Sequence, residues 1–162
     1  MRRETQTPEE TEALGAELAA RLTPGDLVLV AGELGSGKTT LVRGAARALG
    51  VTDQVTSPTF TIGQVYGGGP VEVAHIDLYR LHTLSGEDPA LLDDYLTPQR
   101  VGFVEWPEIA TPELGRPAAR VTIEHLGGDR RAIEIECTCS ASTPPRRPPA
   151  CACCATPATH WS

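Results

Sequence analysis

The stretch from Gly32 to Thr39 constrains the fold of this chain more than any other feature. It reads GELGSGKT and fits the phosphate-binding loop pattern G-x-x-x-x-G-K-[ST]. Glycines let the backbone curl so that successive N–H groups point at phosphate oxygens, and the N-terminus of the following helix adds its positive dipole end. The pattern places Lys38 to reach the β- and γ-phosphates and the hydroxyl of Thr39 to bind Mg²⁺.

The segments on either side of this loop supply the context that the pattern requires. Residues 26–31 form a short apolar run typical of a buried parallel strand. Residues 39–49 are mostly apolar and end at Gly50, which indicates a helix with a glycine stop. A glycine-rich turn with a solvated lysine is the alternative, but strand, loop and helix occur in the required order. Lys38 is also the only lysine of the chain, at a position that suits a compact ammonium better than a planar guanidinium.

A change of composition near Cys137 divides the 162 residues into one domain, 1–136, and a tail, 137–162. The tail is rich in Pro and Ala and is expected to be disordered. It holds all five cysteines, but the Cys-x-Cys-Cys run at 151–154 lacks a zinc-finger spacing. A translated frameshift or a spurious extension explains the tail better than a metal site does.

Charge and hydropathy indicate the cellular compartment of the protein and the kinds of partner it binds. No apolar run approaches the length of a membrane span, and the N-terminus lacks the apolar core of a signal peptide, so a cytoplasmic protein without membrane contact is expected. A domain without cysteine also suits a reducing cytosol. The net charge of −7 argues against direct binding of nucleic acid.

The rest of the domain shows the periodicities of a mixed α/β fold. We expect a helix that begins with the capping box Thr7-Pro8-Glu9-Glu10 and stops near 23–25, an antiparallel hairpin of 57–66 and 71–77 with Phe60, Ile62 and Tyr66 on one side, a helix at 84–96, a strand at 101–105, and a closing hairpin of 120–124 and 131–136. These elements predict three layers, in which helices cover both faces of a mixed, mostly parallel sheet.

Two strands end in a carboxylate, Asp77 and Glu105. Acidic residues at strand ends beside a phosphate-binding loop are where Mg²⁺, or the water bound to it, needs a negative partner. Two such residues permit a division of labour, with one on the metal and the other orienting water. His75 is interpreted as a packed strand residue rather than a catalytic base. Arg80 either pairs with Asp77, faces a phosphate, or lies on the surface.

Two smaller features leave alternatives open. Thr59 and Thr61 either hydrogen-bond a γ-phosphate or its attacking water, or occur for their strand propensity. Trp106 either closes over the nucleotide, contacts a partner, or packs in the core.

Four segments together resemble the TsaE (YjeE) family, the tRNA threonylcarbamoyladenosine biosynthesis ATPases. The likeness covers residues 5 to 136 and is carried by GELGSGKTT at 32–40, SPTFT at 57–61, HIDLYRL at 75–81 and VEWPE at 104–108. The resemblance implies a small P-loop ATPase that works with the proteins TsaB and TsaD. It implies that TsaD performs the transfer to tRNA, that the ATPase drives turnover, and that this chain meets tRNA only indirectly.

The resemblance also implies a role for each matching residue. ATP and Mg²⁺ are the implied cofactors. The implied nucleotide-binding residues are Leu34, Gly35, Ser36, Gly37, Lys38, Thr39, Thr40 and Trp106. Thr39 and Glu105 are the implied metal ligands, and Asp77 is implied to be important for hydrolysis, together with Lys38 and Glu105.

Two competing functions are weighed from the residues. A small-molecule kinase shares the strand, loop and helix but needs an acceptor pocket and an arginine-bearing lid; Arg43, Arg47 and Arg80 are available, yet no lid segment is evident. A GTP-operated switch usually reads guanine with an Asn-Lys-x-Asp segment, which a chain with Lys38 as its single lysine lacks.

Overall fold

The computed structural model describes residues 1–58, 61–79, 90–109 and 114–138. Its elements are β1 (Arg2–Thr5), α1 (Pro8–Ala19), β2 (Leu27–Gly32), α2 (Lys38–Ala48), β3 (Gly63–Tyr66), β4 (Glu72–Asp77), α3 (Ala90–Asp93), β5 (Arg100–Glu105), the 3-10 turn η1 (Pro107–Ile109), β6 (Ala119–His125) and β7 (Arg131–Cys137). The predictions for Thr59, Phe60, Arg80 and the tail from residue 139 onward fall outside the described residues.

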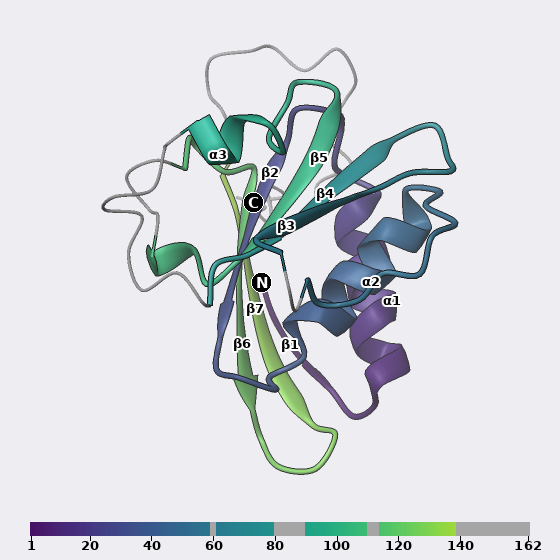
Figure 1. Ribbon diagram of the computed structural model, residues 1–162. Helices are drawn as coiled ribbons and strands as arrows, with labels where there is room; N and C mark the ends of the chain where they lie inside the picture. The colour runs from purple at the N-terminus through teal and green to yellow at the C-terminus, as the bar shows by residue number, and fades with distance from the viewer. Residues whose placement is uncertain (59–60, 80–89, 110–113, 139–162) are drawn as a thin grey trace, which may run out of the picture.

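The strands form one mixed sheet in the order β1-β7-β6-β2-β5-β4-β3 (Figure 1). The four central strands β6, β2, β5 and β4 run parallel. Strands β7 and β3 flank them in antiparallel pairing with β6 and β4, and β1 pairs antiparallel with β7 at the outer edge. After β2 the chain continues on the side of the sheet that holds β4 and β5, and after β5 it crosses to β6 on the other side of β2. In open α/β sheets, ligands bind beyond the carboxyl ends of the strands where the connections diverge in this way.

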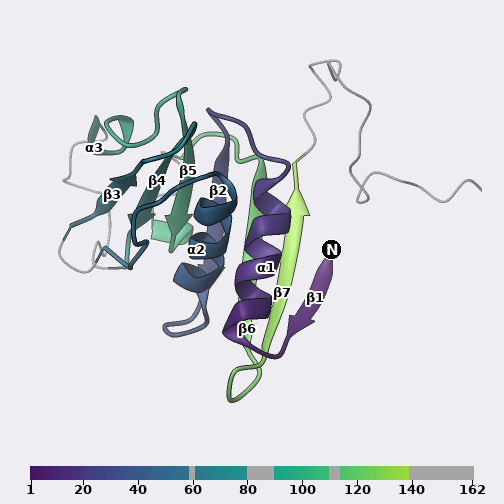
Figure 2. The same cartoon turned by 90° about the vertical axis from the view of Figure 1, so that its right-hand side faces the viewer.

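Two apolar clusters cover the two faces of the sheet. Helices α1 and α2 lie side by side across one face (Figure 2), where they pack on inward-facing strand residues that include Val28, Val30 and Phe103. The opposite face packs Leu29 and Val104 against Leu92 of the one-turn helix α3. Since side chains alternate along a strand, His75, Asp77 and Glu105 fall on the α2 face with Val73 and Phe103. The predicted layers, with helices on both faces of the sheet, are confirmed.

Close contact between α1 and α2 depends on a glycine in each helix. A Cβ on Gly15 would stand 2.1 Å from the carbonyl oxygen of Leu41, and a Cβ on Gly44 would stand 2.0 Å from that of Glu12. The backbones of the two helices therefore come into direct contact, at a distance that a side chain at either glycine would prevent. Glu12 also accepts from Arg43 at 3.3 Å and from Arg47 at 2.5 Å, which ties the outer edges of the two helices together.

The sequence patterns predicted most of the helices and strands, but some of the predicted boundaries differ from those in the structure. Thr7 caps α1 by accepting from the Glu10 backbone N–H at 3.2 Å, yet the helix ends at Ala19, before the predicted stop. The first hairpin strand begins only at Gly63, so Ile62 packs on the α3 face while Tyr66 packs on the α2 face; the prediction of one shared side is wrong. Strand β1 was missed, because its four polar residues show no apolar alternation; it is held by its pairing with β7 and by side-chain contacts of Arg3 and Thr5 with α1.

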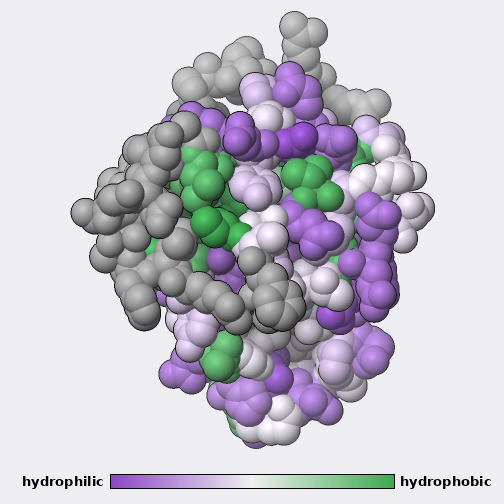
Figure 3. All heavy atoms as spheres, viewed as in Figure 1, coloured by the Kyte–Doolittle hydropathy of each residue, from purple (hydrophilic) through white to green (hydrophobic). Residues whose placement is uncertain are grey.

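None of the helices in the described part of the chain has the length and apolar character that crossing a membrane requires. On the face shown in Figure 3, hydrophobic residues form small patches among polar ones. Scattered apolar surface of this kind is ordinary for a folded domain.

Replacing Gly44 by Ala is expected to destabilise the domain. Helix propensity alone favours Ala over Gly by about 1 kcal/mol, but the new methyl group would overlap the rigid backbone of α1. We expect the overlap to outweigh propensity and the free energy of unfolding to fall by about 2 kcal/mol, as measured by urea denaturation. Gly115→Ala is the control, because no atom of the described part of the chain lies within 4 Å of its added Cβ. Equal stability of the two variants would contradict the described helix contact.

Candidate functional site

The phosphate-binding loop connects the buried strand β2 to α2, and its backbone is shaped for an anion. Gly37 is the N-cap of α2 with φ 103°, and as a glycine it offers no side chain to cap the helix. The N–H groups of the first helical turn have no partner within the helix, so they remain available to an external acceptor. Gly32 begins the loop, where a Cβ would stand 2.5 Å from the carbonyl oxygen of Ile123. Strand β6 thus packs directly against the loop backbone.

Lys38 lies folded inside this loop. Its Nζ donates to the carbonyl oxygens of Gly32 at 2.8 Å and Glu33 at 2.9 Å, and lies 4.2 Å from the centroid of the Trp106 ring. Burial lowers the pKa of the Lys38 ammonium, while the negative charges of Glu105, Asp77 and Glu108 act in the opposite direction. The ammonium thus lies within a cluster of carbonyls, carboxylates and an indole face, all of which stabilise its positive charge.

Glu105 is the centre of a hydrogen-bonded group at the end of β5. Its Oε1 accepts from the Thr39 hydroxyl at 2.9 Å and lies 2.8 Å from Nε2 of His75. Glu105 is 3% exposed and His75 is fully buried. Strands β4 and β5 are paired in parallel with Asp77 opposite Glu105, so the strand register brings both predicted acidic residues to the same edge of the sheet.

Asp77 is more accessible than Glu105 and is held from two sides. Its Oδ1 accepts from the backbone N–H of Tyr79 at 3.0 Å, and its Oδ2 accepts from the hydroxyl of Ser57 at 3.1 Å. Both oxygens are therefore oriented while the carboxylate still faces the cleft. A carboxylate placed in this way is suited to orient or accept a proton from a water molecule.

Trp106 has an unusual backbone conformation directly after Glu105. Its φ of 59° lies in the left-handed region, and among the described residues no other non-glycine residue has a positive φ. That conformation costs about 1–3 kcal/mol and tends to occur at functional sites. It turns the indole over Lys38 and against Tyr79, whose ring centroid lies 4.9 Å away.

These groups line one cleft of about 300 Å³. Its lining is Leu34, Gly35, Gly37, Lys38, Thr39, Thr40, Ser57, Asp77, Tyr79, Glu105 and Trp106. Every site residue predicted from the sequence therefore lies at the cleft except Ser36, whose side chain is fully buried within the loop. Leu34 is 73% exposed and Tyr79 is 47% exposed, so the cleft has apolar side chains at its rim.

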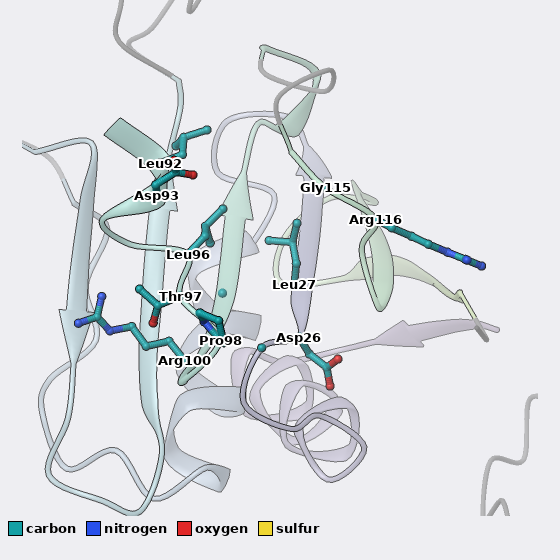
Figure 4. A pocket seen from close by; sticks show the side chains of 12 residues that line it. Asp26, Leu27, Leu92, Asp93, Leu96, Thr97, Pro98, Arg100, Gly115 and Arg116 are labelled. Atoms are coloured by element: carbon teal, nitrogen blue, oxygen red, sulfur yellow. The ribbon is translucent and has the colours of Figure 1, made fainter. Parts of the chain in front are cut away.

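A larger hollow of about 510 Å³ lies at the other end of the parallel strands, around Asp26, Leu96 and Arg100 (Figure 4). Leu27 and Leu96 face it, whereas the side chain of Arg116 extends away from it. Arg100 is already committed to Glu72 and to the carbonyl of Asp94. Because this hollow lacks converging charged groups and the phosphate-binding loop, we assign the chemistry to the smaller cleft.

Arg131 is a site residue that the sequence did not reveal. It begins β7, and its Nε donates to the carbonyl oxygen of Ser36 at 2.7 Å, behind the phosphate-binding loop. It also donates to Gly128 and Arg130 carbonyls within its own turn. The bond to Ser36 joins residues 95 positions apart, and no local pattern marks such a contact. Tyr79 and Ser57 were likewise missed as site residues, although both lie in segments that carry the family likeness.

The residues present fit a nucleoside triphosphate with Mg²⁺. The uncapped first turn of α2 and Lys38 offer donors and positive charge to phosphate oxygens. Thr39 and Glu105 offer the oxygen ligands that Mg²⁺ prefers. The described residues contain no group of three or more His, Cys, Asp or Glu side chains placed around one metal; in nucleotide sites Mg²⁺ is usually bound by one or two protein ligands, substrate phosphates and water.

Comparison with known proteins shows the family to which the chain is similar. The family model described as threonylcarbamoyl adenosine biosynthesis protein TsaE matches residues 5–133. The tRNA threonylcarbamoyladenosine biosynthesis protein TsaE of Bacillus subtilis is 41% identical over 129 residues, which cover 80% of each chain. The protein of the same name from Streptomyces coelicolor is 44% identical over 119 residues, covering 72% of this chain and 80% of the relative.

A solved structure shows the same fold. The crystal structure of Bacillus subtilis YdiB superposes with a TM-score of 0.68 and is 35% identical in sequence. The match covers 82% of both chains. The family likeness expected from the four sequence segments is therefore confirmed.

Nucleotide binding is expected to change the fluorescence of Trp106. The Lys38 ammonium lies over the indole and must turn from the loop carbonyls to reach a phosphate. The change is measured in a Trp161→Phe background, in which Trp106 is the only tryptophan. Lys38→Met in the same background should show no saturable change. An unchanged emission spectrum during binding that calorimetry detects would contradict the proposed movement.

Arg131→Ala is expected to weaken nucleotide binding about tenfold, because it removes the charged hydrogen bond to the Ser36 carbonyl and the longer one to the Gly35 carbonyl. Without the guanidinium, the Ser36 carbonyl is free to turn and the loop N–H groups lose their alignment. Arg130→Ala is the matched control, because within the described residues the Arg130 side chain donates only to the Leu126 carbonyl of its own turn. Titration of a fluorescent nucleotide measures both variants, and equal affinities would rule out support of the loop by Arg131.

Proposed function

The chain belongs to the TsaE family of threonylcarbamoyl adenosine biosynthesis proteins, and from this premise we propose that it hydrolyses ATP with Mg²⁺ to support the formation of threonylcarbamoyladenosine in tRNA. The observation that carries the proposal is the convergence of Lys38, Thr39, Asp77 and Glu105 in one cleft. The proposed reaction takes place in the cytoplasm, where tRNA is available for modification.

Each group has a separate part in this mechanism. The first turn of α2 and Lys38 bind and neutralise the phosphates, which is most of what catalysis of phosphoryl transfer requires. Thr39 and Glu105 would hold Mg²⁺, which when bound screens the charge of the phosphate oxygens. Asp77, oriented by Ser57 and the Tyr79 backbone, would position the attacking water and receive its proton.

The partners we propose are TsaB and TsaD, with tRNA bound through their complex. The cleft is open, and Leu34 and Tyr79 expose apolar surface at its rim, which suits a site that a protein partner completes. The net charge of −7 fits a subunit that binds proteins and leaves tRNA to others. Weak hydrolysis by the isolated chain follows from the same reasoning.

The kinase alternative loses support from the position of two of its three candidate arginines, since Arg80 lies outside the described residues. Arg43 and Arg47 both pair with Glu12 on α1, and neither lines the cleft. Neither guanidinium is therefore placed to cover a transferring phosphoryl group. Phosphate release that equals ADP formation in the presence of small-molecule acceptors would separate hydrolysis from phosphotransfer.

ATP hydrolysis with and without TsaB and TsaD tests the proposal. We expect phosphate release to require Mg²⁺, to stop on addition of EDTA, and to rise when both partners are present. Asp77→Asn should lower kcat by about 100-fold while retaining nucleotide affinity, since it removes the proton acceptor. Lys38→Ala should lose nucleotide binding. Asp129→Asn, in the exposed turn before β7, is the control.

Equal rates with and without the partners would contradict the proposed partnership, and full activity of Asp77→Asn would contradict the role of Asp77.

A further inference from the structure

His75 contacts the candidate site from beneath and was interpreted from the sequence only as a packed strand residue. It lies on β4 two residues before Asp77, on the face that meets α2. Its side chain is fully buried, and Nε2 lies 2.8 Å from Oε1 of Glu105. Most side-chain hydrogen bonds in proteins go to backbone groups or water. The one side-chain hydrogen bond described for His75 instead goes to Glu105, a proposed metal ligand.

We propose that His75 is a positioning residue that fixes the Glu105 carboxylate in the orientation needed to hold Mg²⁺. The proposal rests on the proposed function, because it concerns the metal that this function requires. It assigns His75 no contact with nucleotide, water or metal.

The surroundings of the ring define which nitrogen carries the proton. Within the described residues, Nδ1 of His75 is buried and has no hydrogen-bond partner. A buried N–H without an acceptor is costly, and a proton on Nε2 is needed to donate to the carboxylate. The geometry therefore places a proton on Nε2, which donates to Glu105.

The two hydrogen bonds to Glu105 involve the same oxygen. Thr39 and His75 both lie within hydrogen-bond distance of Oε1, and neither bond uses Oε2, while the carboxylate lines the cleft. If the Thr39 hydroxyl turns its oxygen toward Mg²⁺, the bond from His75 remains and holds the carboxylate in place. Partners of this kind behind a metal ligand typically change metal affinity or activity by about 10–100-fold.

Position along the side chain provides a matched pair of substitutions. In Gln, the amide nitrogen is as many bonds from Cβ as Nε2 is in His, whereas the shorter Asn places its amide near the position of Nδ1. His75→Gln can therefore donate to Glu105, while His75→Asn cannot reach it. Both introduce the same chemical group into the same buried site, so a loss of packing alone does not favour one over the other.

The first test measures the hydrogen bond in the protein without nucleotide. Long-range ¹H–¹⁵N NMR spectra report the tautomer of each of the four histidines, and His75 is assigned by the signal that His75→Gln removes. We expect the proton on Nε2, exchanging slowly with water, and faster exchange in Glu105→Ala. A proton on Nδ1 would overturn the proposal.

The second test measures binding of a fluorescent, non-hydrolysable ATP analogue with Mg²⁺ or with EDTA. We expect His75→Asn to raise the Mg²⁺ concentration for half-maximal binding about 10–100-fold and to leave affinity in EDTA unchanged. His75→Gln should stay within a few-fold of wild type, and thermal unfolding confirms that both variants fold. Equal effects of Asn and Gln, or an equal loss with and without Mg²⁺, would show a purely structural role and refute the proposal.

The same measurements separate this proposal from the proposed function. A wild-type protein that binds the analogue equally well with Mg²⁺ and with EDTA refutes the metal-positioning role of His75, whereas the proposed ATPase is contradicted by phosphate release that continues in EDTA. A Mg²⁺-dependent wild type with an unaffected His75→Asn leaves the function standing and removes only the role of His75.

Discussion

The buried carboxylate of Glu105 and its two hydrogen-bonded neighbours hold the site together. A carboxylate taken out of water without partners is strongly destabilising, and Glu105 is almost fully buried. Thr39 from α2 and His75 from β4 meet it at one oxygen, and the nearby Lys38 ammonium offsets its charge. One acidic side chain thereby fixes a helix start and two strands relative to one another, so the alignment of the cleft and the packing of the α2 face depend on the same contact.

The fold supplies this contact through strand register. Parallel pairing of β4 with β5 places Asp77 opposite Glu105, and β5 lies next to β2, which leads into the phosphate-binding loop. A shift of one residue would turn either acidic side chain to the opposite face of the sheet. The apolar residues that share the face, such as Val73 and Phe103, therefore determine where the charged ones lie. The strand register that buries these apolar residues is therefore the same register that brings the acidic residues of the site together.

The sequence predicted the parts of the site that neighbouring residues determine. The loop, its helix and the strand-end acidic residues are local patterns, and their places in the structure agree with them. The contact of His75 with Glu105 joins residues 30 positions apart, and that of Arg131 with Ser36 joins residues 95 positions apart. Both depend on strand register and strand order, which the periodicity of the sequence does not encode. The left-handed conformation of Trp106 is also imposed by tertiary contacts, since a bulky residue does not prefer it. Strand β1 forms for the same reason, through pairing with β7 and side-chain contacts with α1.

The position of Lys38 has a consequence for the affinity of the loop for an anion. Its ammonium donates to the carbonyl oxygens of Gly32 and Glu33, and these two bonds hold the loop in its curved conformation. A phosphate oxygen that binds Lys38 has to compete with these two internal acceptors, and the competition lowers its affinity. The loop therefore contains acceptors of its own, and the two carbonyls occupy the donors that an anion would otherwise use.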